Sequence, residues 1–180
     1  MKLFPSPRPI RSLSGMTLVE IMVATAVGSI ALAAIMSLFL YSARSFVAMG
    51  NYADLDRASR NALDLMSREI RGTRSLSSFS ATRLQFVDYD NTPLTYRYDS
   101  STRQLVREKA STNQTVMLQQ CDFVEFHVSQ RNPSNNFTFY PTTTPSQAKL
   151  IDVSWRCSRE VLGARVNTES VQTAKIVVRN

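Results

Sequence analysis

The sequence has few of the residues from which reactive sites are built. Its 180 residues include two cysteines and one histidine, His127. There is no CxxC pair or Cys/His cluster, which argues against a zinc or dithiol redox site, and the GxSxG, HExxH and phosphate-loop signatures are missing as well. His127 lies in an alternating stretch with Glu125 and Ser129 on its face, a pattern that favours a surface histidine over a general base. We expect no enzyme, no cofactor and no metal site.

Charge is missing from one long stretch of the chain. From Ile21 to Tyr41 the sequence is apolar without a single charged residue, and about 20 such residues suffice for a helix that crosses a membrane. Ahead of it lie Lys2, Arg8 and Arg11, with no acid before Glu20. This excess of positive charge predicts a cytoplasmic N-terminus and an exported C-terminal part.

Two residues at the start of this stretch need an explanation. Gly15 ends the basic leader, and Glu20 is an ionisable residue in the apolar region, where such a side chain costs about 3 kcal/mol on insertion scales. An ordinary secretory signal cut near Ala43 would need a shorter apolar region. A plain signal anchor would not explain why an acid lies at position 20.

The leader ending in Gly15, the acid Glu20 and the apolar helix together resemble the N-terminal signal of type IV prepilins and type II secretion pseudopilins. The resemblance implies that a prepilin peptidase cuts after Gly15 and methylates the new terminal amine of Met16. Met16 departs from the family pattern, in which the first mature residue is most often Phe.

The resemblance also implies a role for Glu20. Its carboxylate would pair with the Met16 ammonium of a neighbouring subunit inside a filament, so that neither charge is buried alone. The simpler alternative is that Glu20 reaches up to the lipid headgroups and has no specific partner.

Beyond the membrane segment the helical pattern continues. Apolar residues recur at spacings of three and four along one stripe, with charged residues opposite; the stripe is Tyr52, Leu55, Ala58, Ala62, Met66 and Ile70. We expect one helix from Met16 to Arg71, ended by Gly72. The predicted organisation is a cleaved leader 1–15, a helix 16–72 with its membrane segment at about 16–41, and an exported head 73–180.

The head has the composition of short strands joined by turns. Strands are predicted at Leu84–Asp88, Leu94–Tyr98, Gln104–Arg107, Gln114–Leu118, Asp122–Ser129, Phe137–Tyr140, Lys149–Arg156 and Gln172–Val178. The fold class is α+β, a long N-terminal helix packed on an antiparallel β-sheet head. The order of these elements is similar to the J-type minor pseudopilins and their W-type relatives in type IV pili.

Cys121 and Cys157 lie 36 positions apart, each beside a predicted strand. A structural disulfide is one interpretation, because disulfides form outside the cytoplasm. Two separate free thiols are the other.

Two further sites can be weighed from composition. Removal of a leader with three positive residues lowers the net charge from +7 to +4, and acids are interleaved with the helix arginines, so nucleic-acid binding is disfavoured. Asp88, Asp90, Asn91 and Asp99 could offer oxygen ligands to calcium, but their spacing fits no calcium loop and favours hairpin turns.

The sequence thus predicts a structural subunit: a minor pilin or pseudopilin at or near the tip of a type IV pilus or a type II secretion pseudopilus. Its implied partners are the prepilin peptidase, other major and minor pilin subunits and an inner-membrane assembly platform. The implied location is the bacterial inner membrane, crossed once, with a periplasmic head. A DNA-uptake pilin and a plain membrane-anchored surface protein are the alternatives.

Overall fold

The computed structural model describes residues 15–110, 113–134, 138–161 and 169–178. The first element, α1, is a helix of 55 residues, Leu18–Gly72. The chain divides into two compact units, Met1–Ala43 and Arg44–Asn180, so α1 contributes its first part to one unit and its second part to the other. No proline lies between Pro9 and Pro93, and α1 is therefore free of the residue that most strongly interrupts a helix.

The end of α1 coincides with the predicted stop at Gly72, but the residue that caps it is Thr73. The Thr73 hydroxyl donates a hydrogen bond of 2.8 Å to the carbonyl of Ile70, and its N–H donates one of 3.0 Å to the carbonyl of Glu69. These bonds satisfy carbonyls that a helix end leaves without partners.

The first sheet is an antiparallel meander. It consists of β1 (Ser75–Ser80), β2 (Arg83–Val87), β3 (Pro93–Asp99), β4 (Gln104–Lys109) and β5 (Asn113–Leu118) in that order. Asp90 and Asp99 accept hydrogen bonds from residues two positions later, which closes the β2–β3 and β3–β4 turns.

The second sheet has the order β7-β6-β8-β9. Its strands are β6 (Cys121–Arg131), β7 (Phe139–Pro141), β8 (Leu150–Ser158) and β9 (Glu169–Val177), with a short 3₁₀ helix, η1, at Pro145–Gln147. All pairs are antiparallel. The predicted alternation is confirmed, because Val124, Phe126 and Val128 of β6 are buried while the residues between them face outward.

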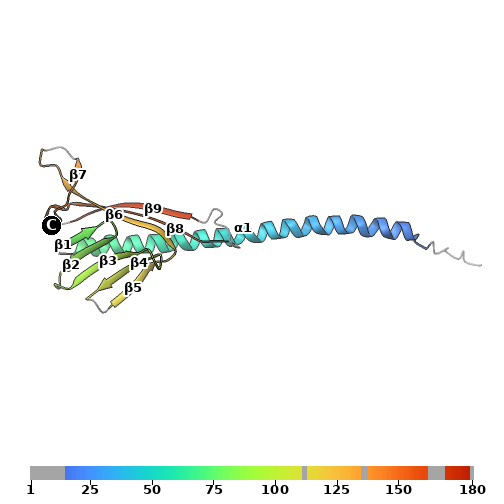
Figure 1. Cartoon of the computed structure of the whole chain (residues 1–180), viewed down its shortest axis with the longest axis horizontal. Coiled ribbons are helices and arrows are strands. Elements are labelled where there is room, and N and C mark those ends of the chain that lie inside the picture. Colours follow the sequence, from blue (N-terminus) through green and yellow to red (C-terminus); the bar gives the residue numbers. More distant parts are fainter. Residues whose placement is uncertain (1–14, 111–112, 135–137, 162–168, 179–180) are drawn as a thin grey trace, which may run out of the picture. The chain divides into compact units, whose positions relative to one another are not determined.

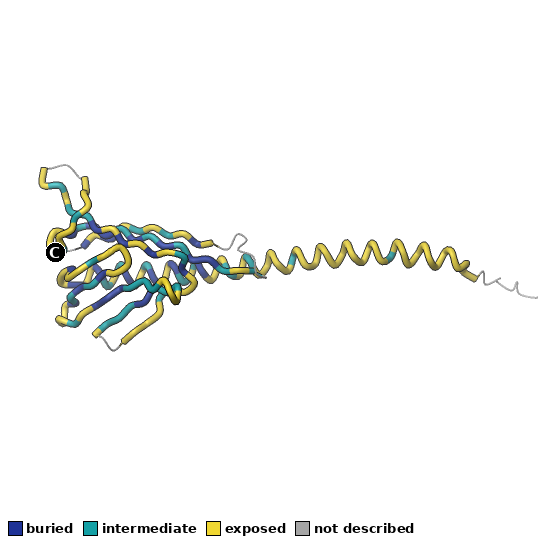
Figure 2. The backbone as a smooth tube through the Cα atoms, in the orientation of Figure 1, coloured by how far each residue is buried: buried dark blue, intermediate teal, exposed yellow. Residues whose placement is uncertain are grey.

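Both sheets pack against the same stretch of α1 (Figure 1). The helix side chains buried there are Leu55, Ser59, Ala62, Met66 and Ile70. They join one core with side chains of both sheets, including Phe86 and Tyr96 from the first and Ile151, Val153 and Trp155 from the second. Figure 2 shows buried positions on these strands and on the second part of α1, whereas the first part of α1 is exposed almost throughout.

The observed elements agree with the predicted fold class, a long apolar N-terminal helix packed on antiparallel sheets. Four details differ. The helix begins at Leu18 rather than at the predicted Met16. The head has two sheets rather than one, β1 was not predicted, and Tyr52 of the predicted stripe is half exposed while Ser59 is buried. The strand predicted at 137–140 appears as β7, with Phe137 outside the described residues.

Candidate functional site

Thr17 and Glu20 form a reciprocal cap at the start of α1. The Thr17 hydroxyl accepts a hydrogen bond of 3.3 Å from the Glu20 N–H, and the Glu20 carboxylate accepts one of 3.4 Å from the Thr17 N–H. This is a capping box, in which a Ser or Thr and an acid three residues later satisfy each other's backbone donors. The carboxylate also sits in the first turn, where the helix dipole favours a negative charge. Sequence analysis identified Glu20 but missed Thr17, although the T-x-x-E spacing is visible.

Gly15 and Met16 precede this cap and lie outside the helix. Both are exposed, Met16 with 70% of its surface accessible, and a Cβ built on Gly15 would meet no atom within 4 Å. The peptide bond between them is therefore accessible on a non-helical segment next to a helix start. The leader residues 1–14 lie outside the described residues.

The apolar part of α1 contains hydroxyls that are satisfied within the helix. Thr25 bonds to the carbonyls of Ile21 and Met22, Ser29 to that of Ala26, and Ser37 to that of Ala33, at 2.8 to 3.0 Å. Such bonds remove the cost of placing a hydroxyl in hydrocarbon. Among the described residues, α1 is the one helix long and apolar enough to cross a membrane.

Glu69 ties the second part of α1 to the first sheet. Its two carboxylate oxygens accept hydrogen bonds from Arg107 on β4, with Nε 2.7 and 3.0 Å away, and from the hydroxyl of Tyr96 on β3. Burial, followed by the hydrogen bond to Glu69, raises the pKa of Tyr96 far above its ordinary value. The hydrogen bond to Glu69 raises the pKa of Arg107. The cluster is a largely buried, bidentate ion pair with a phenol attached.

Ser59 ties the same helix to the second sheet. The indole N–H of Trp155 on β8 donates a hydrogen bond of 3.2 Å to the Ser59 hydroxyl, and both residues are fully buried. A buried indole N–H without an acceptor would lose a hydrogen bond, so the small polar Ser59 completes the packing of Trp155. This residue interrupts the apolar stripe, which is why periodicity alone did not select it.

Cys121 and Cys157 are brought together. They are register partners on β6 and β8, both are buried, and their Sγ atoms are 2.6 Å apart as free thiols.

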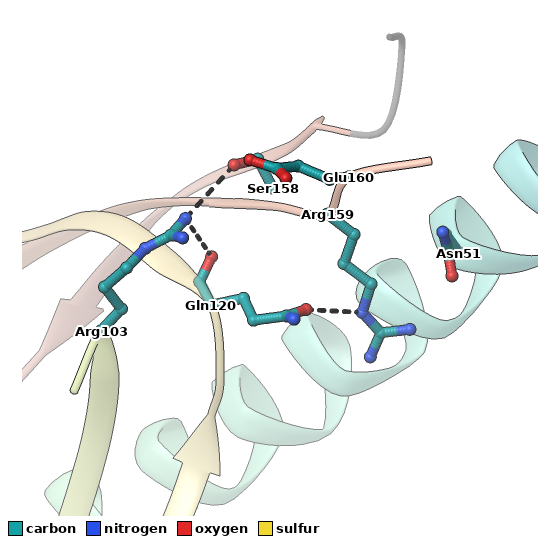
Figure 3. A pocket seen from close by; sticks show the side chains of 6 residues that line it. All are labelled: Asn51, Arg103, Gln120, Ser158, Arg159 and Glu160. Atoms are coloured by element: carbon teal, nitrogen blue, oxygen red, sulfur yellow. Dashed lines mark hydrogen bonds between the residues drawn. The ribbon is translucent and has the colours of Figure 1, made fainter. Parts of the chain in front are cut away.

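A polar cavity of about 330 Å³ is lined by Gln120 and Ser158, the sequence neighbours of this pair, among other residues (Figure 3). Asn51, Arg103, Gln120, Ser158, Arg159 and Glu160 line it. Its arginines already have partners: Arg103 bonds to the Gln120 carbonyl and to Asp122, and Arg159 bonds to the Gln120 side chain and Asp54. The residues that line the cavity thus hold parts of the head together. Both arginines are engaged in these bonds, which disfavours the cavity as a site for an anionic ligand.

The other residues weighed from sequence have ordinary surroundings. His127 is largely exposed on β6 with Nε2 3.3 Å from Glu125. Asp88 and Asp90 face the ammonium of Lys109, at 2.6 and 4.0 Å, and the hydrogen bond to Asp88 raises the pKa of Lys109. Asp99 belongs to a turn away from these two, bonded to Ser101 and 3.5 Å from Arg97. The described residues contain no group of three or more His, Cys, Asp or Glu side chains placed to hold a metal.

The N-terminal site also has a counterpart among known families. Residues 11–36 match the family model described as the prokaryotic N-terminal methylation motif. This match supports a place among the type IV pilins and pseudopilins. No curated protein and no solved structure matches the chain.

The matched pilin-type segment contains Gly15, Met16, Thr17 and Glu20, together with most of the apolar run. A motif of this kind implies processing by prepilin peptidase and assembly with other pilins, and it suggests a structural subunit rather than an enzyme. The motif and the long apolar helix are consistent with a membrane-anchored pilin.

Proposed function

We propose that this chain is a minor pilin or pseudopilin, a structural subunit assembled at or near the tip of a type IV pilus or a type II secretion pseudopilus. One observation carries the proposal. The segment that matches the methylation motif, residues 11–36, contains an exposed Gly15–Met16 bond followed by Glu20, whose carboxylate caps the start of α1. The described residues hold no group of three or more His, Cys, Asp or Glu side chains placed to bind a metal.

The proposed pathway begins with insertion into the bacterial inner membrane. Lys2, Arg8 and Arg11 keep the leader in the cytoplasm, the apolar part of α1 crosses once, and the head lies in the periplasm. Prepilin peptidase then cuts between Gly15 and Met16 and methylates the new amine. The site of the cut lies just before the start of α1 rather than inside the helix.

Assembly then uses the carboxylate of Glu20. In the single subunit this group accepts the weakly bound N–H of Thr17 at 3.4 Å, a long hydrogen bond. In the filament it would accept the Met16 ammonium of a neighbouring subunit, a charge-assisted and stronger bond. The capping bond therefore keeps the carboxylate partly satisfied in the membrane and is weak enough to be exchanged.

The assignment to a minor subunit of the J type is the finest part of the proposal. It rests on the large head with its five-stranded meander and second four-stranded sheet, and on the retained Glu20. The proposed partners are major and minor pilin subunits and the assembly platform of the inner membrane.

Intact mass of the protein from native membranes tests the proposal. We expect a species that lacks residues 1–15 and carries one added methyl group at Met16. Gly15→Val should yield only the full-length species, because a branched side chain there blocks the cut. Gly50→Val is the matched control, since Gly50 is likewise exposed with no atom within 4 Å of a built Cβ. A wild-type product that retains residues 1–15 would instead identify a membrane-anchored surface protein.

A further inference from the structure

The chain passes from the first sheet to the second through a very short segment. β5 ends at Leu118 and β6 begins at Cys121, so only Gln119 and Gln120 connect the two sheets. Gln120 has a positive φ of 57°, which marks a sharp change of direction. The crossover is therefore a tight connection between the two sheets.

The first residue after the crossover faces a cysteine. Cys121 pairs with Cys157 in the register of β6 and β8, with their exposed fractions at 0% and 1%. Directly opposed residues of antiparallel strands have Cα atoms about 4.5 to 5.5 Å apart, within the range that a disulfide spans. The side chains also point toward each other, because the two sulfur atoms are in direct contact.

The backbone on both sides of this pair is already fixed. The Cys121 N–H donates to the Arg103 carbonyl at 2.9 Å, and the Ser158 N–H donates to the Gln120 carbonyl at 3.0 Å. Tyr98 donates its hydroxyl to the Cys121 carbonyl at 3.0 Å. Figure 3 shows how Arg103, Gln120 and Ser158 converge beside the crossover. A bond between the sulfurs therefore needs little movement of the main chain.

We propose that Cys121 and Cys157 form an intrachain disulfide that links β6 to β8 within the second sheet, directly after the crossover from β5. The pairing follows from register and burial alone. Its formation in an oxidising compartment rests on the proposed function, which places the head outside the cytoplasm.

The bond forms by exchange with a disulfide oxidant of that compartment. One cysteine thiolate attacks a sulfur of the oxidant, which forms a mixed disulfide and releases one oxidant thiol. The second cysteine then attacks the protein sulfur of the mixed disulfide and releases the other oxidant thiol. Two cysteine thiols are thus oxidised by two electrons, the oxidant disulfide is reduced to two thiols, and the two cysteine protons pass to the oxidant sulfurs.

The closed head is a poor substrate for this exchange. Neither sulfur is exposed, and the contact with Cys157 together with burial raises the pKa of the Cys121 thiol. Since the thiolate is the attacking species, we place the exchange before the core closes. The same burial then protects the finished disulfide from reductants.

Thiol labelling of the full chain tests the pairing. The protein is extracted from membranes in detergent, unfolded in denaturant and treated with iodoacetamide, with or without prior reduction. We expect no labelled cysteine without reduction and two after reduction, and a non-reduced digest in which the Cys121 and Cys157 peptides are linked. Two labelled cysteines without reduction would overturn the proposal, and so would a disulfide-linked dimer. Residues 1–15 are scored in the same mass spectrum, so a failure of processing is seen separately.

Thermal unfolding tests the consequence. Closing a loop between residues 36 positions apart should raise the midpoint by about 10 °C. Wild type that is reduced in denaturant and refolded with tris(carboxyethyl)phosphine should therefore unfold at a midpoint lower by about this much than wild type refolded without it, while the double variant Cys121→Ala, Cys157→Ala should unfold at one temperature after either treatment. An equal midpoint for wild type in both conditions would overturn the proposed disulfide.

Discussion

The two parts of α1 share one helical backbone but have opposite surroundings. In the first part, apolar side chains such as Ile30 and Phe39 keep 72% and 68% of their surface exposed. In the second part, Met66 and Ile70 are completely buried against the sheets. Burial of apolar surface drives folding, so the second part finds its partners within the chain, whereas in the proposed function the first part finds them in lipid and in other subunits.

The polar groups of the two parts differ in the same way. Glu69 accepts hydrogen bonds from the Arg107 guanidinium and from the Tyr96 hydroxyl, both in the head of the same chain. Glu20 has only long hydrogen bonds within its own first turn. The comparison teaches that α1 carries one acid with strong partners from its own head and one with only long bonds in its own first turn, for which the proposed assembly would supply a strong partner.

Of all the substitutions, replacement of Glu20 should have the largest effect, and it tests the part of α1 that depends on assembly. We expect Glu20→Gln to leave membrane insertion intact and to reduce incorporation into sheared filaments at least tenfold, because the Met16 ammonium of the neighbour would be buried without a partner at a cost of several kcal/mol. Immunoblots of membrane and sheared fractions measure both quantities.

Glu125→Gln is the control for loss of a carboxylate, since Glu125 is exposed on β6 and remote in sequence from the motif. Wild-type incorporation of Glu20→Gln would remove the proposed role of Glu20.

Among the substitutions in the head, removal of Trp155 should cause the largest loss of stability. We expect Trp155→Ala to lower the free energy of unfolding by about 3 to 5 kcal/mol, because it leaves a large cavity between β8 and α1 and frees Ser59. Chemical denaturation of the full chain in detergent measures this loss. Trp155→Phe keeps most of the ring and should cost less than half as much. Equal losses for the two variants would show that the hydrogen bond, rather than packing, dominates.

Charge removal at Glu69 should have an intermediate effect. Glu69 and Arg107 side chains are 20% and 15% exposed, so the pair is partly screened by water. We expect Glu69→Gln to cost about 2 to 3 kcal/mol of unfolding free energy, less than the 3 to 5 kcal/mol typical of a fully buried broken pair. The double variant Glu69→Gln, Arg107→Met should recover part of this loss. A double variant as unstable as the sum of the single ones would show that the two side chains act independently.

Much of the second part of α1 and of the sheets that pack on it could be predicted from sequence, because their hydrophobic patterns are periodic. The spacing of Leu55, Ala62, Met66 and Ile70 placed the helix face, and alternation in β6 and β8 placed the buried strand positions. Ser59 escaped because a buried hydroxyl is explained by its partner Trp155, which is 96 positions away. Strand β1 escaped because four of its six residues are serines and only Leu76 is buried.

The candidate site of the first part was predictable for a different reason. Gly15, Met16 and Glu20 stand out as local exceptions in a simple apolar sequence, and the motif match covers all three. The bond from Thr17 to Glu20 is also local and could have been predicted from spacing. The contact of Cys121 with Cys157 was one of two interpretations that the sequence left open, because it depends on the register between β6 and β8, which bring together residues 36 positions apart.

Alkaline pH should lower the free energy of unfolding of the head through Tyr96. Its pKa is raised in the folded head, so the folded state holds the phenol proton while the unfolded state loses it above about pH 10. This contribution is complete below pH 10 and declines as pH rises toward the raised pKa, at about 1.4 kcal/mol per pH unit. Unfolding measured from pH 8 to pH 11 should show this decline in wild type, and Tyr96→Phe should lack that component. Parallel curves would contradict the assignment to Tyr96.

The smallest effect should come from Thr17, which acts on the first part alone. Loss of its hydroxyl removes the acceptor for the Glu20 N–H, and N-cap losses cost about 1 kcal/mol. Thr17→Ala should therefore speed amide exchange in the first turn of α1 by about fivefold in detergent while leaving exchange in the Leu55–Ile70 stretch unchanged. Thr17→Ser retains the oxygen and should behave as wild type. Thr17→Ala keeps the main-chain N–H that binds the Glu20 carboxylate, but fraying of the first turn leaves that carboxylate less firmly placed, so filament incorporation should fall by a few fold, far less than in Glu20→Gln. If Thr17→Ala abolished incorporation outright, the cap would be part of the assembled contact itself rather than a state that precedes it.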